Sequence, residues 1–524
     1  MESQLKVLMF VHGACTSVII IVTVFSPANT ANILAVFPHQ GFSHNVVYQP
    51  YILELANRGH NITIITNYPL EHPNINNISI RGSMPISNNK KNISHIEGKF
   101  MNEIQSSIST IWNFHYRGKI YEAMFTVDGV KKLLNSPSKF DLLITEHFNN
   151  ELFLGFAFKF NLPFILLSSC NMLPWNQHAI GQPYSLANIP STLTGLGTKM
   201  NFYNRAMNTI SHIVQLLGYK LFRRTRDEAI IKQKLDIEVS LDQLILNASL
   251  IMVNTHFTML ESKPLVPAAV EVGGIHITPI KPLPVDIQKY IDEAENGVIY
   301  FCMGSLLLGE SFSAEKRQMF LNVFDKIPQR ILWKWEGELP GKPSNVMIQK
   351  WMPQRDILAH PNVKLFISHG GLLGTTEAVH EGVPILSMPM FGDQVTNIKA
   401  IVRRGAAEMM NYGDLNEDEI FVKITSMLTN PIYKQKAKEL SEAFRDRPMP
   451  ALETAVYWTE YVIRYKGAPL LRSATVGTPW YQYYLIDVLF VIFLFVTTIV
   501  VLLYCLIFKV LLRLLNRKSK EKQS

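Results

Sequence analysis

Near its C-terminus the chain contains an apolar stretch, residues 488–508, that has no charged side chain. At about 1.5 Å per residue, a helix of this length spans roughly 30 Å, the thickness of the hydrocarbon core of a bilayer. Four aromatic residues precede it, where an aromatic belt is expected: Trp480, Tyr481, Tyr483 and Tyr484. We predict a transmembrane helix over 488–508, preceded by a juxtamembrane segment over 471–487.

The tail after this stretch, residues 509–524, is strongly basic and holds most of the formal net charge of +8. Basic residues are typical of the cytosolic side of a spanning helix, so this charge is no evidence for nucleic-acid binding. Lys520 and Lys522 are fifth and third from the end and resemble a dilysine retrieval signal of the endoplasmic reticulum. We predict a cytosolic tail in the membrane of that organelle.

At the other end, residues 1–31 have the pattern of a secretory signal peptide: Lys6, an apolar middle, and small residues near Ala28. An uncleaved anchor is the alternative, and cleavage after Ala28 or Ala31 fits equally well. The two ends together predict a single-pass type I protein whose body lies in the lumen. Four Asn-x-Ser/Thr triplets agree with this: Asn61, Asn77, Asn92 and Asn247. Only Cys170 and Cys302 are placed to form a disulfide.

The body of the chain alternates short apolar strands with helical stretches, which is typical of parallel sheets covered on both faces. The first series predicts an N-terminal domain over residues 32–262, and the second predicts a C-terminal domain over 285–470. Between them, residues 263–284 are rich in proline and read as a linker. The predicted fold class is α/β, with two doubly wound, Rossmann-like domains facing across a cleft and one C-terminal transmembrane helix.

The most informative segment is 351–394. Residues 363–367 read as a strand, and Gly370-Gly371 after it lets backbone approach a ligand. A helix that starts near Leu372 directs free N–H groups into the same turn, which suits a phosphate group, and His369 is placed to donate a hydrogen bond to a diphosphate. Singly these residues also fit a packed turn, so the specificity lies in their spacing.

That spacing resembles the sugar-nucleotide signature of the UDP-glycosyltransferase superfamily, with two facing domains of the GT-B type. Three short stretches, residues 140–141, 271–275 and 372–375, resemble the invertebrate, especially insect, branch of this superfamily. The resemblance implies that Trp351 stacks on uracil, Glu377 holds the ribose hydroxyls, and His369 contacts the diphosphate. Asp393 and Gln394 would hold sugar hydroxyls. The remaining implied donor-binding residues are Ser305, Gln354, Gly371 and Thr375. Because Leu373 replaces a commonly polar residue, phosphate contact relies on backbone N–H groups and on Thr375 or Thr376.

Transfer of a sugar to a hydroxyl requires a base that removes the hydroxyl proton. His44 follows the first predicted strand, at an edge that faces the cleft, and His39, His60 and His72 are the other candidates. The family's base is the histidine of a Ser-His pair at this point, and His44 matches it. A carboxylate usually orients such a histidine. The family's aspartate position holds Glu146 here, and Glu151 is a nearby alternative; Glu146 also fits a helix-capping charge.

The chain contains no Asp-x-Asp pair and no Cys/His cluster with zinc spacing. We therefore predict an inverting transfer that uses no metal and no cofactor beyond the UDP-sugar co-substrate. The acceptor is expected to be a small lipophilic molecule, as in detoxification. Two alternatives are a catalytically silent sugar-nucleotide binder and a partner that modulates a related transferase; a homo-oligomer is also compatible with the sequence.

The predicted donor is UDP-glucose rather than UDP-glucuronate, because Asp393 would repel a carboxylate and a selective site would offer an arginine. The nearest basic residue in the segment is Lys399, and Arg117 or Arg205 of the first domain are further candidates. Residues 199–226 form a basic, amphipathic stretch. It fits either a helix on the membrane surface that helps apolar acceptors enter, or a helix packed on the core.

Overall fold

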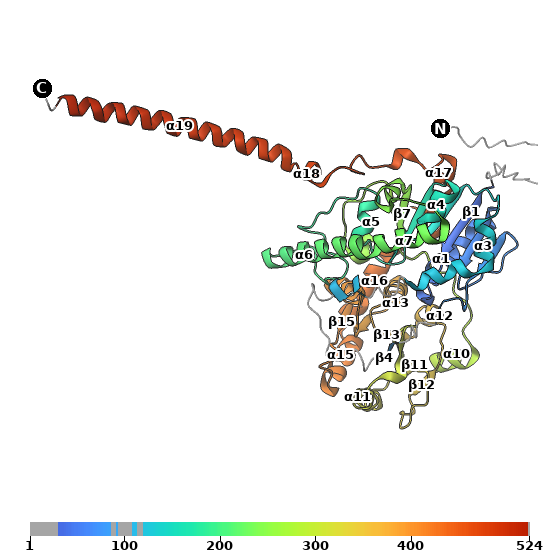
Figure 1. Ribbon diagram of the computed structural model, residues 1–524. Helices are drawn as coiled ribbons and strands as arrows, with labels where there is room; N and C mark the ends of the chain where they lie inside the picture. The colour runs from blue at the N-terminus through green and yellow to red at the C-terminus, as the bar shows by residue number, and fades with distance from the viewer. Residues whose placement is uncertain (1–29, 85–90, 93–106, 110, 113–118, 522–524) are drawn as a thin grey trace, which may run out of the picture.

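A computed structural model describes residues 30–84, 91–92, 107–109, 111–112 and 119–521 (Figure 1). The predicted signal peptide falls almost entirely outside the described residues, as does Arg117. Within them, the chain forms two large parallel sheets, a two-stranded parallel sheet of β4 (Lys91–Asn92) and β10 (Leu307–Leu308), and one long helix that extends from the body (Figure 1). This confirms the predicted fold class, and each large sheet is built from apolar strands of the kind expected from the sequence.

The first sheet has seven parallel strands in the order β3-β2-β1-β5-β6-β7-β8. Their bounds are Ile75–Ser79, Asn61–Thr66, Asn32–Phe37, Leu142–Glu146, Phe164–Ser168, Leu250–Val253 and Ala269–Glu271. The chain runs outward from β1 to β3 and then returns to the other side of β1 with β5. The strand order therefore reverses between β1 and β5, which is where open α/β sheets bind ligands.

Helices of the first domain and its neighbours are α1, α3, α4, α5, α6, α7, α8 and α9. Their bounds are Phe42–Asn57, Asp128–Leu134, Leu154–Phe160, Pro174–Ala179, Phe202–Gly218, Thr225–Leu235, Leu241–Leu244 and Phe257–Leu260. A π-helical turn, Tyr219–Arg224, joins α6 to α7. Helix α1 begins at Phe42, where extended backbone at Gly41 provides its N-cap. His44 consequently lies in the first turn of a helix.

The second sheet has six parallel strands in the order β12-β11-β9-β13-β14-β15. Their bounds are Val346–Gln349, Arg330–Lys334, Val298–Cys302, Val363–Ser368, Ile385–Ser387 and Ala407–Met409. Alternate residues of β9 pack into two different cores, with Tyr300 on one face and Phe301 on the other. Both faces are thus covered, and the strand order reverses between β9 and β13.

Helices α10 to α17 belong to the chain after the first sheet. Their bounds are Val285–Asp292, Ala314–Asp325, Gln354–Leu358, Leu372–Glu381, Gln394–Arg403, Glu417–Thr429, Pro431–Arg445 and Ala451–Arg464. Helix α17 returns to the first domain, where Thr459 hydrogen-bonds to Tyr51 and Glu453 pairs with Arg58. The predicted linker also contributes to this domain, since β8 lies within residues 263–284 and pairs with β7. Cys170 and Cys302 are buried free thiols.

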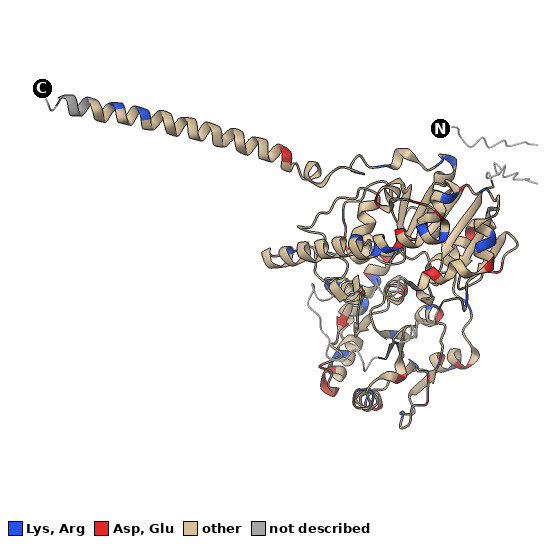
Figure 2. Cartoon of the chain, in the orientation of Figure 1, with Lys and Arg blue, Asp and Glu red and all other residues tan. Residues whose placement is uncertain are grey.

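The C-terminal segment begins with a short helix, α18 (Trp480–Tyr483), and continues into α19 (Ile486–Glu521). Residues Ile486–Asn516 have a mean hydropathy of 3.0, and this helix is long and apolar enough to cross a membrane. Figure 2 shows that its middle carries no charge, with an acidic residue at the end near the body and basic residues toward the far end. The predicted span over 488–508 lies inside this helix.

Candidate active site

The residues predicted to carry the chemistry gather at the two points where strand order reverses. In the first sheet, His44 follows β1 and Glu146 ends β5. In the second, Ser305 follows β9 and His369 follows β13. The two edges face each other, since Phe42 of α1 packs its ring edge-to-face on Trp351, with ring centroids 5.7 Å apart.

His44 is held on one side by two polar groups from different strands. Its Nδ1 lies 2.5 Å from Oε1 of Glu146 and 3.0 Å from Oγ of Ser169, which follows β6. The ring stacks on His39, with centroids 3.6 Å apart, and meets the edge of Phe148 at 4.8 Å. Among the described residues, no hydrogen bond reaches Nε2 of His44, so this nitrogen is available to a ligand.

Glu146 lies in an environment that favours its charged form. Burial alone would raise the pKa of this carboxyl group, but the neighbouring His44 and His39 and the Ser169 hydroxyl together lower the pKa below its usual value. An ionised Glu146 accepts the Nδ1–H of His44 and fixes the tautomer in which Nε2 is unprotonated.

The alternative carboxylate, Glu151, is engaged elsewhere. It is fully buried and accepts two hydrogen bonds from Arg224, at 2.7 Å from Nε and 2.9 Å from Nη2. It also lies 3.4 Å from Nε2 of His147. Burial would raise the pKa of Glu151, but these partners lower it to about 2. The structure therefore brings Glu146, and not Glu151, to His44.

His369 lies between two glycines. A Cβ on Gly304 would come within 2.6 Å of its ring, and a Cβ on Gly371 within 2.5 Å. Both positions must lack a side chain for the imidazole to stay where it is, which explains the second glycine after β13. Burial, assisted by the charge of Lys334, lowers the pKa of His369 to about 4, so the ring is neutral near neutral pH.

The start of α13 lies beside this ring, with Gly371 as its N-cap residue. The Thr376 hydroxyl donates to the carbonyl of Leu372 at 2.8 Å, whereas Oγ1 of Thr375 is buried and has no hydrogen-bond partner among the described residues. Of the two threonines expected near a phosphate, Thr375 is therefore the one whose hydroxyl can bind a phosphate without losing another hydrogen bond. Ser305 is exposed on the turn after β9.

Glu377, one turn further along α13, is contacted from two sides. Nε2 of Gln354 donates to its Oε2 at 2.6 Å, and Nε2 of His276 lies 3.9 Å from its Oε1. Burial raises the pKa of Glu377 to about 7, although the hydrogen bond from Gln354 opposes this shift. Burial lowers the pKa of His276 to about 4, so its ring adds no positive charge.

Trp351 is 60% exposed, although it is a large aromatic side chain. Among the described aromatic side chains, Phe42 is the one that contacts its ring, edge-to-face. An exposed indole beside a buried carboxylate and amide offers a flat surface on which a planar base can stack.

Asp393 and Gln394 begin α14, at the side of the second domain that is nearest His44. Burial raises the pKa of Asp393, partly offset by a 2.9 Å hydrogen bond from Asn397 and by the charge of His44 across the cleft. Oε1 of Gln394 accepts backbone N–H groups of Met390 and Phe391 at 2.7 and 3.1 Å. Only the amide nitrogen of Gln394 is therefore left for a sugar hydroxyl.

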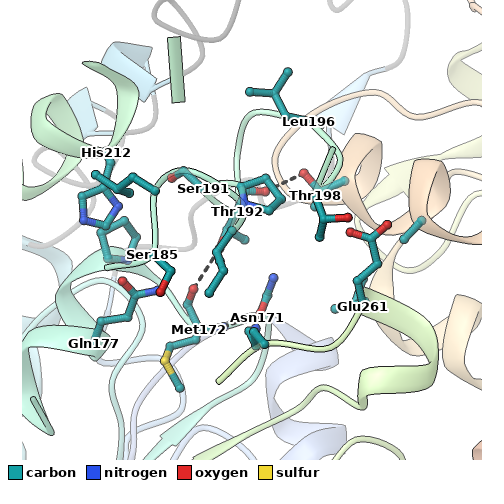
Figure 3. Close-up of a pocket in the computed structure, with 18 of the residues that line it drawn as sticks. Asn171, Met172, Gln177, Ser185, Ser191, Thr192, Leu196, Thr198, His212 and Glu261 are labelled. Atoms are coloured by element: carbon teal, nitrogen blue, oxygen red, sulfur yellow. Dashed lines mark hydrogen bonds between the residues drawn. The ribbon is translucent and has the colours of Figure 1, made fainter. Parts of the chain in front are cut away.

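A cavity adjoins this region between the two domains (Figure 3). It begins at Asn171 and Met172, just beyond Ser169, and is bounded by His212 of α6 and by Thr396 and Arg403 of α14. The loop before α6 closes onto α14, where Thr396 donates to the carbonyl of Thr192 at 2.6 Å.

Three residues at the site escaped the sequence analysis: Ser169, His276 and Phe42. Ser169 follows a buried strand, so its place at a strand end was a signal that could have been used. His276 lies in the predicted linker and Phe42 two residues before His44, and nothing in their local patterns indicated contact with the second domain. Among the described residues, no group of three or more His, Cys, Asp or Glu side chains is arranged to hold a metal ion.

Residues 32–521 match the family described as "UDP-glucoronosyl and UDP-glucosyl transferase". The chain is 45% identical over 491 residues to "UDP-glycosyltransferase UGT5" of Dactylopius coccus, covering 91% of this chain and 92% of the relative. It is 40% identical over 477 residues to "UDP-glucosyltransferase 2" of the same organism, covering 90% and 91%. Human "UDP-glucuronosyltransferase 2A2" is 31% identical over 506 residues, covering 91% and 92%.

The structure of "LpCGTa in complex with UDP" superposes with a TM-score of 0.52 at 18% identity, covering 83% of this chain and 100% of that chain. This likeness shows the fold alone. The family match and the similar relatives establish the family and the type of activity. The chain belongs to the UDP-glycosyltransferase family and is an enzyme that transfers a sugar from a UDP-sugar donor.

Proposed function

We propose that this enzyme transfers glucose from UDP-glucose to a hydroxyl of a small lipophilic acceptor, with inversion and without a metal. The first domain would bind the acceptor and the second the donor. The observation that carries the mechanism is the pair of His44 and Glu146, at 2.5 Å, on the domain that faces the donor half.

In this mechanism Nε2 of His44 takes the proton of the acceptor hydroxyl as its oxygen attacks the anomeric carbon. The bond between that carbon and the diphosphate oxygen breaks on the opposite face, and UDP leaves. Glu146 stabilises the imidazolium that forms, and the Ser169 hydroxyl helps to hold the carboxylate. The rings of His39 and Phe148 pack against the imidazole of His44 and restrict its rotation.

The donor would lie along α13 and α14. Trp351 supplies a stacking surface for uracil, and Glu377, held by Gln354, accepts the ribose hydroxyls. The diphosphate meets the N-terminal N–H groups of α13, with His369, Thr375 and the turn at Ser305 around it. No step here requires a metal, and the chain has no Asp-x-Asp pair to bind one.

Glucose is supported by the charges near the sugar end. Asp393 suits neutral hydroxyls, and the two candidate cations among the described residues, Arg205 and Lys399, offer little to a carboxylate. Arg205 is exposed on α6 and donates to the carbonyl of Met200, and the ammonium of Lys399 points toward Gly195 of the interdomain loop. Arg117 lies outside the described residues. The 40% identity to a relative named a UDP-glucosyltransferase points the same way.

A lipophilic acceptor is supported by the proposed setting of the protein. We propose that α19 spans the endoplasmic reticulum membrane, with both domains in the lumen and the basic tail in the cytosol. The cavity that begins at Asn171 is a candidate for the acceptor site, because Asn171 lies two residues beyond Ser169, whose hydroxyl is 3.0 Å from Nδ1 of His44.

The test is His44→Ala, assayed with UDP-glucose and a panel of phenols and steroids. Loss of the base is expected to reduce turnover by about 100-fold or more while UDP binding is preserved. Near-normal turnover would remove His44 from the mechanism. His72→Ala is the matched control, because His72 is a half-buried histidine that bonds to Asn57 and is not among the proposed site residues.

A further inference from the structure

Helix α6 (Phe202–Gly218) packs on the protein with its polar face. Its buried positions are Asn208, Ser211, His212, Gln215 and Gly218, none of which is an apolar side chain. A helix on the surface of a soluble protein turns its apolar stripe toward the core. Helix α6 does the reverse, so its amphipathic sequence is inverted relative to the protein interior.

Two residues of the buried polar face, Asn208 and Gln215, are specifically bonded. Asn208 donates to the carbonyls of Leu186 and Ile189, at 2.9 and 2.8 Å, and accepts the N–H of Ser191 at 2.7 Å. Gln215 accepts from the Ser191 hydroxyl at 3.2 Å and donates to Ser107 at 2.9 Å. These bonds fix the rotation of α6, because turning the apolar stripe inward would leave several buried polar groups unpaired.

The outward face is apolar over the whole length of α6 and the π-helical turn that follows. Phe202 is 79% exposed, Leu217 54% and Leu221 62%. The other exposed apolar side chains of this face are Tyr203, Ile210, Ile213 and Phe222. A continuous stripe of large apolar side chains in water is costly, and on a native protein it marks a surface that another phase or molecule covers.

The charged residues of the segment itself are of one sign. No acidic residue occurs between positions 199 and 226, and the basic residues there are Lys199, Arg205, Lys220, Arg223, Arg224 and Arg226. Of these, Arg205 and Lys220 are exposed beside the stripe, and Lys220 also pairs with Asp242 at 2.8 Å. An apolar stripe with basic side chains at its edges is the pattern of a helix that binds a bilayer containing anionic lipids.

This helix lies next to the start of the proposed membrane span. His212 of α6 meets the ring of Tyr184 edge-on, with centroids 4.8 Å apart. Burial, with smaller contributions from the nearby phenols of Tyr484 and Tyr483 in the segment leading into α19, raises the pKa of Tyr184. The same segment is fastened to the first domain by a hydrogen bond from Thr475 to the carbonyl of Gly181. In Figure 1, α6 projects from the body on the same side as α18 and α19.

We propose that the outer face formed by α6 and the π-helical turn docks on the bilayer that α19 enters. The enzyme would then contact the membrane at two places, through α19 and through this face. The apolar stripe sinks into the lipid surface, and Arg205 and Lys220 lie at the level of the headgroups. The cavity lined by His212 lies directly behind this helix and would open close to the lipid surface (Figure 3).

The test uses the full chain in vesicles of phosphatidylcholine and phosphatidylserine, with a nitroxide attached at Leu217→Cys. The matched control is Val422→Cys, because Val422 is 62% exposed on α15 in the second domain. Both are made with Cys15→Ala and Cys505→Ala, which leaves only the buried thiols. Compared with position 422, position 217 is expected to collide severalfold more with oxygen and severalfold less with a water-soluble nickel chelate.

Equal access of the nickel chelate to both positions would overturn the proposal. Spin–spin broadening at position 217 that persists when the protein is diluted in lipid would also overturn it, because it would assign the face to a second copy of the chain. Ile213→Cys provides a second probe of the same stripe. UDP binding by each labelled protein shows that it is folded, and none of these positions lies in the proposed donor or catalytic site.

Discussion

Nδ1 of His44 lies 2.5 Å from Oε1 of Glu146, although the two residues are 102 positions apart in the chain. The parallel pairing of β1 with β5 makes this contact, because it matches Val36 with Thr145 and so brings the ends of the two strands to one level.

We expect Glu146→Gln to lower turnover by about 100-fold or more with UDP binding unchanged, because an amide cannot stabilise the imidazolium. Glu151→Gln is the matched control. It removes one partner of a buried pair with Arg224, which is expected to cost about 3–5 kcal/mol of stability. Thermal unfolding and turnover per folded molecule separate the two effects. Equal losses of turnover in both variants would contradict the assignment.

Donor binding is expected to weaken as the pH falls through about 7, since burial raises the pKa of Glu377 to about 7 and the ribose hydroxyls need the carboxylate form. Affinity for UDP-glucose, whose diphosphate has no monoester proton, should fall by about tenfold for each pH unit below that point. Calorimetric titration at several pH values measures it, and Glu377→Gln should bind weakly at all of them. A flat profile for the unaltered chain would refute this role.

The same raised pKa affects the stability of the donor-free protein. Between about pH 4.5 and 7 the folded chain keeps a proton on Glu377 that the unfolded chain has lost, so this group makes unfolding easier as the pH rises. Denaturant unfolding of the unaltered chain and Glu377→Gln across this range should show the difference. Saturating UDP-sugar should reduce this difference in stability, because the ribose hydroxyls then hydrogen-bond to the carboxylate of Glu377.

Gly371→Ala is expected to displace the imidazole of His369, because the added Cβ would lie 2.5 Å from Nε2. We expect UDP binding to weaken by about tenfold, or about 1.4 kcal/mol. Gly413→Ala serves as the control, since its nearest neighbour would be 3.5 Å from the new Cβ. If both variants bind UDP like the unaltered protein, His369 is not part of the diphosphate site.

A competition between UDP-glucose and UDP-glucuronate for one phenolic acceptor should favour glucose. Asp393 lies where the sugar is expected, and among the described residues the candidate cations Lys399 and Arg205 face other groups. Initial rates with each donor, alone and mixed, give the ratio of kcat/KM. Preference for UDP-glucuronate or UDP-galactose would reject the proposed sugar but leave the transferase activity untouched.

Protease added to sealed microsomes should remove only the basic tail, if α19 spans the membrane with both domains in the lumen. Immunoblotting before and after treatment measures the loss of mass, and detergent should then expose the whole chain. A large loss without detergent would place the domains in the cytosol.

Much of the fold could be predicted because it depends on local patterns of residues in the sequence. Runs of apolar residues such as β1 and β13 have the length and composition of buried parallel strands, and the glycines after β13 fix a turn. The donor segment could be found because its residues are close in sequence and lie on or beside β13, the turn after it, and the helices α12, α13 and α14. The uncharged run before the basic tail likewise determined a helix of spanning length.

Contacts between distant segments were decided only by the tertiary structure. The choice of Glu146 over Glu151 depends on strand register, and the approach of His276 to Glu377 depends on the path of the chain between domains. One local contact could not be predicted either: Oε1 of Gln394 accepts hydrogen bonds from the backbone N–H groups of Met390 and Phe391.

Helix α6 shows the same limit most clearly. Its sequence determined an amphipathic helix, because the apolar residues recur at the helical period. Only the tertiary structure decided which face turns inward, because the bonds of Asn208 and Gln215 to distant backbone and side chains outweigh the usual burial of an apolar stripe. The period of a helix is a local property, whereas its orientation depends on every group that surrounds it.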